Sequence, residues 1–263
     1  MNGAGAEARA ADSLQRYFDQ DPYARFYNLD RLTDVFLTCD VDWAPDFAIE
    51  AVLRAVESHG QKLTIFATHR SEVLLGKRSW LEVGLHPDFT RQDGTARFEE
   101  RIAALKAIYP DAVGMRSHRD FFGNNIGDMA KQNGLRYDAS SFLWNQPFCQ
   151  AHVDYNGMTR FSYCWEDGIH LDMGFGLEVS RVTLHSPGLK ILNVHPILIF
   201  LNSSTEAHRR SVTSRYRDLT SARHAEIAVE VNKQRGIGDV WREMLAYLAA
   251  NGVRTHLLRE ALY

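Results

Sequence analysis

The chain has 263 residues, of which 45% are hydrophobic, and its formal net charge is −3. This length and apolar content predict a large buried core, which we expect to form a single α/β domain over residues 1–263. The charge supplies no overall positive field, so neither a nucleic-acid backbone nor an anionic membrane is expected as the main partner.

Cysteine usage and hydropathy indicate the compartment. Cys39, Cys149 and Cys164 are odd in number and lack C-x-x-C spacing, which argues against a disulfide framework and fits a reducing environment. Residues 1–20 contain no apolar run long enough for the core of a signal peptide, and the sequence has no uninterrupted apolar stretch of about eighteen residues, the length that crosses a bilayer as a helix. We therefore expect a cytoplasmic protein without a membrane span.

Short apolar runs alternate along the chain with segments that have helical periodicity. The first unit is a strand over 35–39, followed by a helix that starts near Pro45 and stops at Gly60. In chain order, the other predicted elements are strands over 62–68 and 80–86, a helix over 98–108, a short strand over 112–115, a helix over 124–133, strands over 135–138 and 189–194, a helix over 239–250 and a strand over 253–257. Two stretches, 144–172 and 203–238, match no regular pattern and are expected to form a lid or a substrate wall.

Alternating strands and helices predict mostly parallel pairing with right-handed crossovers, and therefore either an α/β barrel or a doubly wound sheet. In both architectures, functional groups gather at the carboxyl ends of the strands. The ionisable residues at the ends of the predicted strands are Asp40, Asp42, His86, His118 and His195. We expect them to meet in one site.

Two carboxylates follow the first strand, in the segment Thr38-Cys39-Asp40-Val41-Asp42. Residues two apart on a strand face the same side, so both can point into one site, where their repulsion favours a shared proton or a bound cation. The alternative is a solvated turn in which the aspartates cap a helix, and an isolated pair of this kind does not decide between the two.

His86 and His195 share a placement, because each follows an apolar strand and precedes a proline. An imidazole in this position is a suitable ligand for zinc or another borderline divalent metal. A single histidine at a strand end is more often a hydrogen-bonded structural residue. The repeated arrangement favours a functional interpretation.

In their order and spacing, these segments resemble the polysaccharide deacetylases, the NodB-homology group also called carbohydrate esterase family 4. The Thr38–Asp42 segment is similar to the inserted form of the family's T-F-D-D motif, which implies that Asp40 is the catalytic base and Asp42 a metal ligand. His86 matches the first histidine of the family's H-x-x-x-H motif, whereas Thr90 stands where the second is expected. The resemblance covers about residues 33–200 and implies a single distorted (β/α) barrel.

Further matches assign roles to residues later in the chain. The segment Gly114-Met115-Arg116-Ser117-His118 resembles the third motif and implies that Arg116 orients the catalytic aspartate, while the strand that ends at His195 implies a general acid there. Looser matches assign four residues to the substrate pocket, with the tryptophans expected to stack on a sugar ring: Asp138, Trp144, Trp165 and Asp167.

The threonine at position 90 leaves the third ligand of the implied Asp-His-His metal site open. His118 is the preferred replacement because an imidazole preserves the ligand type, and Asp88 and Asp167 are alternatives. Two other outcomes stay open: a loose site held by Asp42, His86 and waters, and loss of both metal binding and catalysis.

The resemblance implies a hydrolase of non-peptide carbon–nitrogen bonds that uses a divalent metal, expected to be zinc, to remove an acetyl or other acyl group from an N-acylated sugar. The expected cytoplasmic location favours a sugar nucleotide, a lipid-linked sugar or a short glycan intermediate as the substrate, as in O-antigen or other surface-polysaccharide biosynthesis. Two alternatives remain: a catalytically degenerate barrel that binds carbohydrate, and a hydrolase of a cyclic amide or imide.

Overall fold

The computed structural model describes residues 34–90, 97–146, 149–182, 184 and 189–262. The segment 1–20, for which the sequence predicts no signal-peptide core, lies outside these ranges, and the cytoplasmic location stays a prediction. Among the described residues, no helix is long and apolar enough to span a membrane.

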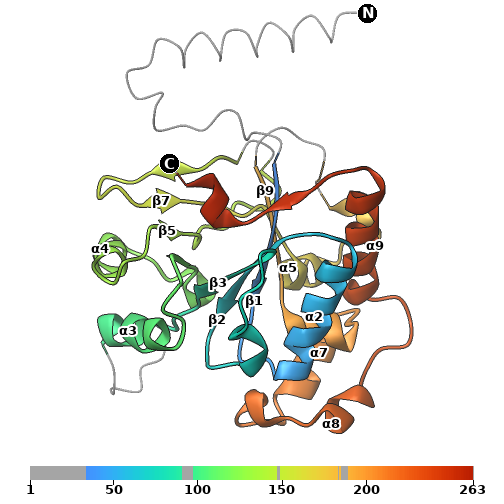
Figure 1. Ribbon diagram of the computed structural model, residues 1–263. Coiled ribbons are helices and arrows are strands. Elements are labelled where there is room, and N and C mark those ends of the chain that lie inside the picture. The colour runs from blue at the N-terminus through green and yellow to red at the C-terminus, as the bar shows by residue number, and fades with distance from the viewer. Residues whose placement is uncertain (1–33, 91–96, 147–148, 183, 185–188, 263) are drawn as a thin grey trace, which may run out of the picture.

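A mostly parallel sheet of ten strands, counted over the described residues, curves into a half-barrel (Figure 1). The strands run in the order β6-β7-β5-β4-β3-β2-β1-β9-β8, and β10 pairs with β1 off this path. One edge of β1 pairs with β9, while its other edge pairs with β10 at the start and β2 at the end. The bounds are β1 Val35–Asp40, β2 Leu63–Ala67, β3 Leu81–Leu85, β4 Gly114–Met115, β5 Tyr137–Asp138, β6 His152–Val153, β7 Thr159–Arg160, β8 Trp165–Glu166, β9 Lys190–Val194 and β10 Thr255–His256.

Helices cover the outside of this sheet, with α3 and α4 on one side of the central strands and α2 and α9 on the other, while α7 packs against α5 and α6 (Figure 1). The α-helices are α2 Asp46–Ser58, α3 Phe98–Ile108, α4 Asn124–Gln132, α5 Asp167–Asp172, α6 Pro196–Leu201, α7 Glu206–Thr213, α8 His224–Ala228 and α9 Ile237–Ala250. Short 3-10 helices are η3 Glu72–Leu74, η4 His118–Asp120, η5 Val179–Arg181, η6 Leu219–Ser221 and η7 Leu258–Ala261.

The predicted alternation of strands and helices is confirmed, and every predicted element is present with its ends displaced by a few residues at most. The two unassigned stretches, expected to form a lid or a substrate wall, contain regular elements, and residues of both, such as Asp172 and Arg209, line the cavity at the carboxyl end of the strands. Residues 144–172 contain β6, β7, β8 and α5, and the β6–β7 pair is antiparallel in an otherwise parallel sheet. Residues 203–238 contain α7, η6, α8 and the start of α9. Strands of two residues are too short to show a periodic pattern in sequence.

The two faces of β1 explain why a carboxylate is buried at its end. Val35, Leu37 and Cys39 belong to the core cluster that the sheet shares with the helices, whereas Phe36 belongs to a separate cluster on the opposite face. Because side chains alternate along a strand, Asp40 lies on the same face as Phe36. The inner face of the half-barrel therefore ends in an acidic group.

A close approach at Gly114 generates a prediction about folding. A Cβ atom at this position would overlap the ring of Tyr137, whereas a Cβ at Gly76 would meet its nearest neighbours, atoms of Arg78, at an ordinary 3.9 Å. Overpacking a buried site costs about 1–3 kcal/mol. Gly114→Ala is therefore expected to lower the free energy of unfolding in urea by at least that amount, and Gly76→Ala to leave it nearly unchanged. Equal unfolding free energies for the two variants would contradict the packing described.

Candidate active site

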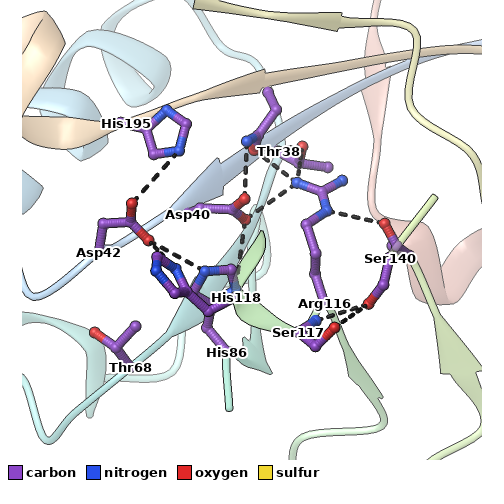
Figure 2. Close-up of polar contacts among 12 residues, drawn as sticks. Thr38, Asp40, Asp42, Thr68, His86, Arg116, Ser117, His118, Ser140 and His195 are labelled. Atoms are coloured by element: carbon purple, nitrogen blue, oxygen red, sulfur yellow. Dashed lines mark hydrogen bonds and ion pairs between the residues drawn. The ribbon is translucent and has the colours of Figure 1, made fainter. Parts of the chain in front are cut away.

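The ends of four parallel strands bring the predicted functional residues together (Figure 2). Asp40 ends β1, His86 follows β3, Arg116 follows β4 and His195 follows β9. A cavity of about 750 Å³ opens at this point, lined by Asp40, Asp42, His86, His118 and His195 among others. The expectation that these side chains meet in one site is confirmed.

Asp42 reaches the site through a turn. The strand stops at Asp40, and Asp42 and Trp43 have left-handed backbone conformations with φ of 47° and 58°. The turn is closed by a hydrogen bond of 2.8 Å from the Ala44 N–H to the Val41 carbonyl. The two aspartates therefore converge as predicted, but for a different reason. Asp42 is not extended, since its φ is positive, and a left-handed turn brings it to the site in place of strand alternation.

The carboxylate of Asp42 lies between three imidazoles (Figure 2). Its Oδ1 is 3.2 Å from Nε2 of His86 and 3.1 Å from Nδ1 of His118, and its Oδ2 is 3.8 Å from Nε2 of His195. Burial alone would raise the pKa of Asp42, but the hydrogen bonds with His118 and His86 and the charge of His195 hold it well below its usual value. Asp42 is thus ionised across the neutral range.

Three of these four side chains, Asp42, His86 and His118, form a group that can hold a metal. Within the described part of the chain, Asp42, His86 and His118 offer ligand atoms that all lie within 4.8 Å of one another. Two imidazoles and a carboxylate are a donor set used for zinc and similar divalent metals. Of the three candidates for a third ligand, His118 is the one that the structure places beside Asp42 and His86.

The other two candidates for a third ligand lie elsewhere. Oδ1 of Asp88 accepts hydrogen bonds from the hydroxyl and the backbone N–H of Thr90, at 2.6 and 2.9 Å. The carboxylate of Asp167 is engaged with His195. Thr90, which stands in place of the expected histidine, is therefore used in a local turn.

Asp40 is held in a fixed position by two partners. Its Oδ1 accepts a hydrogen bond of 3.1 Å from Arg116, and its Oδ2 accepts one of 2.9 Å from the amide of Asn193. The carboxylate is 4% exposed and lies 3.9 Å from the Nδ1 atom of His86. The orientation by Arg116 that the resemblance implies agrees with this geometry.

Arg116 is itself fully buried and links several strands. One of its terminal nitrogens donates to Thr38, to Asp40 and, at 2.6 Å, to the side-chain oxygen of Asn193, while Nε donates to the carbonyl of Ala139. Its guanidinium also lies 4.2 Å from the centre of the Tyr163 ring. A buried charge needs such compensation because removing it from water is costly.

His195 is oriented by the buried carboxylate of Asp167. The Oδ1 atom is 2.6 Å from Nδ1 of the imidazole, and Oδ2 accepts a hydrogen bond of 2.8 Å from the His195 backbone N–H. Burial alone would lower the pKa of His195, but the charge and hydrogen bond of Asp167, with smaller contributions from Asp42 and Glu166, raise it well above the usual value. His195 is therefore a protonated group that faces the cavity through Nε2.

None of the four residues assigned to the substrate pocket lines the cavity: Asp167 is fully buried and holds His195 instead. Trp165 is 1% exposed and donates its indole N–H to His170, and Trp144 packs beside Phe142 and Phe175. Asp138 is also buried, pairs with Arg160 and accepts a hydrogen bond of 2.7 Å from the Ser140 hydroxyl. The expected stacking on a sugar is not supported, because Trp165 is buried and the half-buried Trp144 lies outside the cavity lining.

Asp138 supports the site indirectly, through Ser140. Burial raises its pKa to about 6. The Ser140 hydroxyl that it binds accepts a hydrogen bond of 2.7 Å from the backbone N–H of Ser117, directly between Arg116 and His118. Asp138 therefore supports the loop that carries two of the site residues.

Several residues of the site were not identified from sequence. Trp43 lines the cavity, and its ring packs edge-on against His118 with the centroids 5.0 Å apart. Asn193 binds Asp40, and its place as a polar residue within the apolar strand β9 could have indicated a functional role from sequence. Tyr163 also lines the cavity, as does Glu166, which lies in the sequence-predicted pocket segment between Trp165 and Asp167 and whose pKa burial raises to about 7. Their contributions depend on the short strand β8, which has no recognisable pattern.

Comparison with known proteins agrees with this architecture. The model of the WbmS-like polysaccharide deacetylase family matches residues 37–212. A crystal structure from Bordetella bronchiseptica, described as a polysaccharide deacetylase involved in O-antigen biosynthesis, aligns with a TM-score of 0.73 and 25% identity over 82% of this chain and 91% of that one. A structure from Mycobacterium smegmatis, described as a polysaccharide deacetylase, aligns with a TM-score of 0.51 and 14% identity over 88% of this chain and 92% of that one, which shows a shared fold. No curated protein matches the chain.

The predicted resemblance to polysaccharide deacetylases and the predicted distorted (β/α) barrel are both confirmed by these matches. Such enzymes are hydrolases that act on the carbon–nitrogen bond of N-acetylated sugars. Because the family model spans well over half of its residues, this chain belongs to the WbmS-like polysaccharide deacetylase family.

Proposed function

We propose that this protein is a metal-dependent hydrolase that removes an acetyl or related acyl group from an N-acylated sugar during polysaccharide or O-antigen biosynthesis. The observation that carries the proposal is the arrangement of Asp42, His86 and His118 as a metal-binding group beside two oriented acid–base residues, Asp40 and His195. The Bordetella protein's involvement in O-antigen biosynthesis supports the choice of pathway.

The residues present fit a divalent cation such as zinc. The Nδ1 atom of His86 is buried and has no hydrogen-bond partner in the described structure, and the carboxylate of Asp42 is ionised by its surroundings. A ligating histidine and a charged carboxylate are more easily buried when a cation compensates them. When bound, the metal would act as a Lewis acid on the acyl carbonyl and lower the pKa of a water.

The acid–base residues divide the proton transfers between them. Asp40, whose orientation Arg116 and Asn193 fix, takes the proton of the water that attacks the acyl carbon. His195, protonated because of Asp167, gives its proton to the amine nitrogen as the carbon–nitrogen bond breaks. The products are a free amino sugar and a carboxylate such as acetate.

The first test is release of acetate from N-acetylated sugars by the zinc-loaded protein. Asp40→Asn removes the proton acceptor but keeps its shape, so it is expected to lower kcat by about 10²–10⁴-fold. Asp111→Asn serves as the control, because Asp111 is exposed and pairs with Lys77 at 2.7 Å.

Acetate release unchanged in Asp40→Asn would contradict the role of Asp40. Hydrolysis of cyclic amides with no release of acetate would replace the deacetylase by a different C–N hydrolase. Sugar binding without any turnover would leave a carbohydrate-binding barrel.

A second prediction concerns pH dependence. A general acid acts in its protonated form, so activity falls as the pH rises through the pKa of His195. Asp167→Asn keeps an oxygen to accept the backbone N–H but removes the charge that raises this pKa. The alkaline limb of the kcat/KM profile should therefore move to lower pH, while Asp111→Asn leaves it in place. An alkaline limb at the same pH in Asp167→Asn would exclude His195 as the acid.

A further inference from the structure

The cavity extends well beyond the cluster of Asp40, Asp42 and the three histidines at its base. It extends to α7 and to the segment that joins α7 to η6, which line it with Arg209, Arg210 and Arg217, while the η4 loop contributes Arg119. A volume of about 750 Å³ lies in the range that holds a whole small ligand, so it leaves space beyond a single acylated sugar.

Two of these arginines differ from the others in their pairing. Arg209 donates to Glu206 at 2.7 and 2.8 Å, and Arg210 lies 3.4 Å from Asp172 and 3.5 Å from Glu206. Neither Arg119 nor Arg217 has a hydrogen bond or ion pair among the described residues, although both are exposed and line the cavity.

The carboxylates around the cavity already have partners. Glu206 and Asp172 bind the paired arginines, and Asp218 accepts the backbone N–H and the hydroxyl of Thr220 at the start of η6. The Tyr163 hydroxyl lies 2.8 Å from Asp120 and 3.2 Å from Glu166. None of these contacts involves the side chain of Arg119 or Arg217, so both guanidinium groups can hydrogen-bond a ligand.

The backbone at Arg119 is strained. Its φ and ψ are 57° and 30°, and the next residue, Asp120, has a φ of 51°. Consecutive left-handed residues other than glycine carry a cost that surrounding contacts must sustain, and such strain clusters at binding and catalytic sites. Here the contact of His118 with Asp42 and that of Asp120 with Tyr163 fix the loop on either side of Arg119. The loop that supplies a metal-binding residue therefore also presents a guanidinium to the cavity.

We propose that Arg119 and Arg217 bind a diphosphate that carries the acylated sugar into the cavity. This inference rests on the proposed deacetylase function and names its substrate class: a sugar attached to a diphosphate, whether that diphosphate belongs to a nucleotide or to a lipid carrier. Guanidinium groups bind phosphate oxygens through paired, charge-assisted hydrogen bonds, and both of these arginines line the same cavity. A neutral glycan chain offers no negative charge to pair with them.

Isothermal titration calorimetry of the zinc-loaded protein tests the proposal with three ligands: UDP-N-acetylglucosamine, farnesyl-diphosphate-linked N-acetylglucosamine and the neutral N-acetylglucosamine tetramer. Arg119→Gln and Arg217→Gln should each weaken binding of the diphosphate compounds about tenfold or more and leave the tetramer unaffected. Arg215→Gln is the matched control, because Arg215 pairs with Glu230 at 2.9 Å and does not line the cavity.

The two diphosphate ligands separate the possible carriers. Tighter binding of the nucleotide compound assigns a sugar nucleotide, tighter binding of the farnesyl compound assigns a lipid carrier, and both outcomes support the proposal if the arginine variants weaken them. No binding of either compound to the parent protein overturns the proposal. So does binding that persists in both variants, since the diphosphate would then be held elsewhere, for instance by the metal.

Failure of this inference is distinguishable from failure of the proposed function. If acetate is released from N-acetylated sugars but the arginine variants bind and turn over every substrate like the parent, the deacetylase stands and the diphosphate site is wrong. If the arginines control binding of diphosphate sugars but no acetate is released, the binding site stands and the deacetylase assignment is wrong.

Discussion

The burial of one positive charge at the inner end of the half-barrel organises the site. Arg116 is fully buried, and its guanidinium is compensated by Asp40 from β1, by Asn193 from β9 and by the carbonyl of Ala139 after β5. Breaking a buried pair by removing one partner costs about 3–5 kcal/mol, because the other charge is left uncompensated. The ends of these strands are therefore tied to one another by the same contacts that orient the proposed base.

The other residues of the site are positioned by the segments that follow β4 and β8. After β4, the backbone N–H of Ser117 binds the Ser140 hydroxyl, and the next residue, His118, reaches Asp42, which also contacts His86. After β8, the carboxylate of Asp167 holds both the backbone and the ring of His195. The candidate metal-binding group, the proposed base and the proposed acid are thus positioned by different contacts around a common cavity. This separation is why substitutions at Asp40 and Asp167 are expected to change different steps of the reaction.

The sequence predicted the architecture and the ionisable residues because both depend on local patterns: the alternation of apolar strands with helices, and ionisable residues at strand ends. It also ranked His118 first as the third ligand on ligand type alone, and the structure places that residue with Asp42 and His86. The pocket residues were less predictable. Trp165 and Asp138 lie in segments that the family resemblance assigns to the pocket, but both side chains are buried. Their burial depends on two-residue strands and on partners far away in sequence, such as Arg160 for Asp138. Trp43 was missed because its position depends on a left-handed turn that no residue type signals.

We propose that His118 completes a metal site in which a threonine replaces the expected histidine. The most direct test is elemental analysis of the purified, unchelated protein and of Asp42→Ala, His86→Ala and His118→Ala, with His69→Ala as a control, because His69 lines the same cavity outside the metal-binding group. Stoichiometric zinc or another transition metal is expected in the parent and in His69→Ala, and loss of that metal is expected in the other three variants. A parent protein that holds no metal even after reloading, or a His118→Ala variant that keeps its metal, would contradict the proposal.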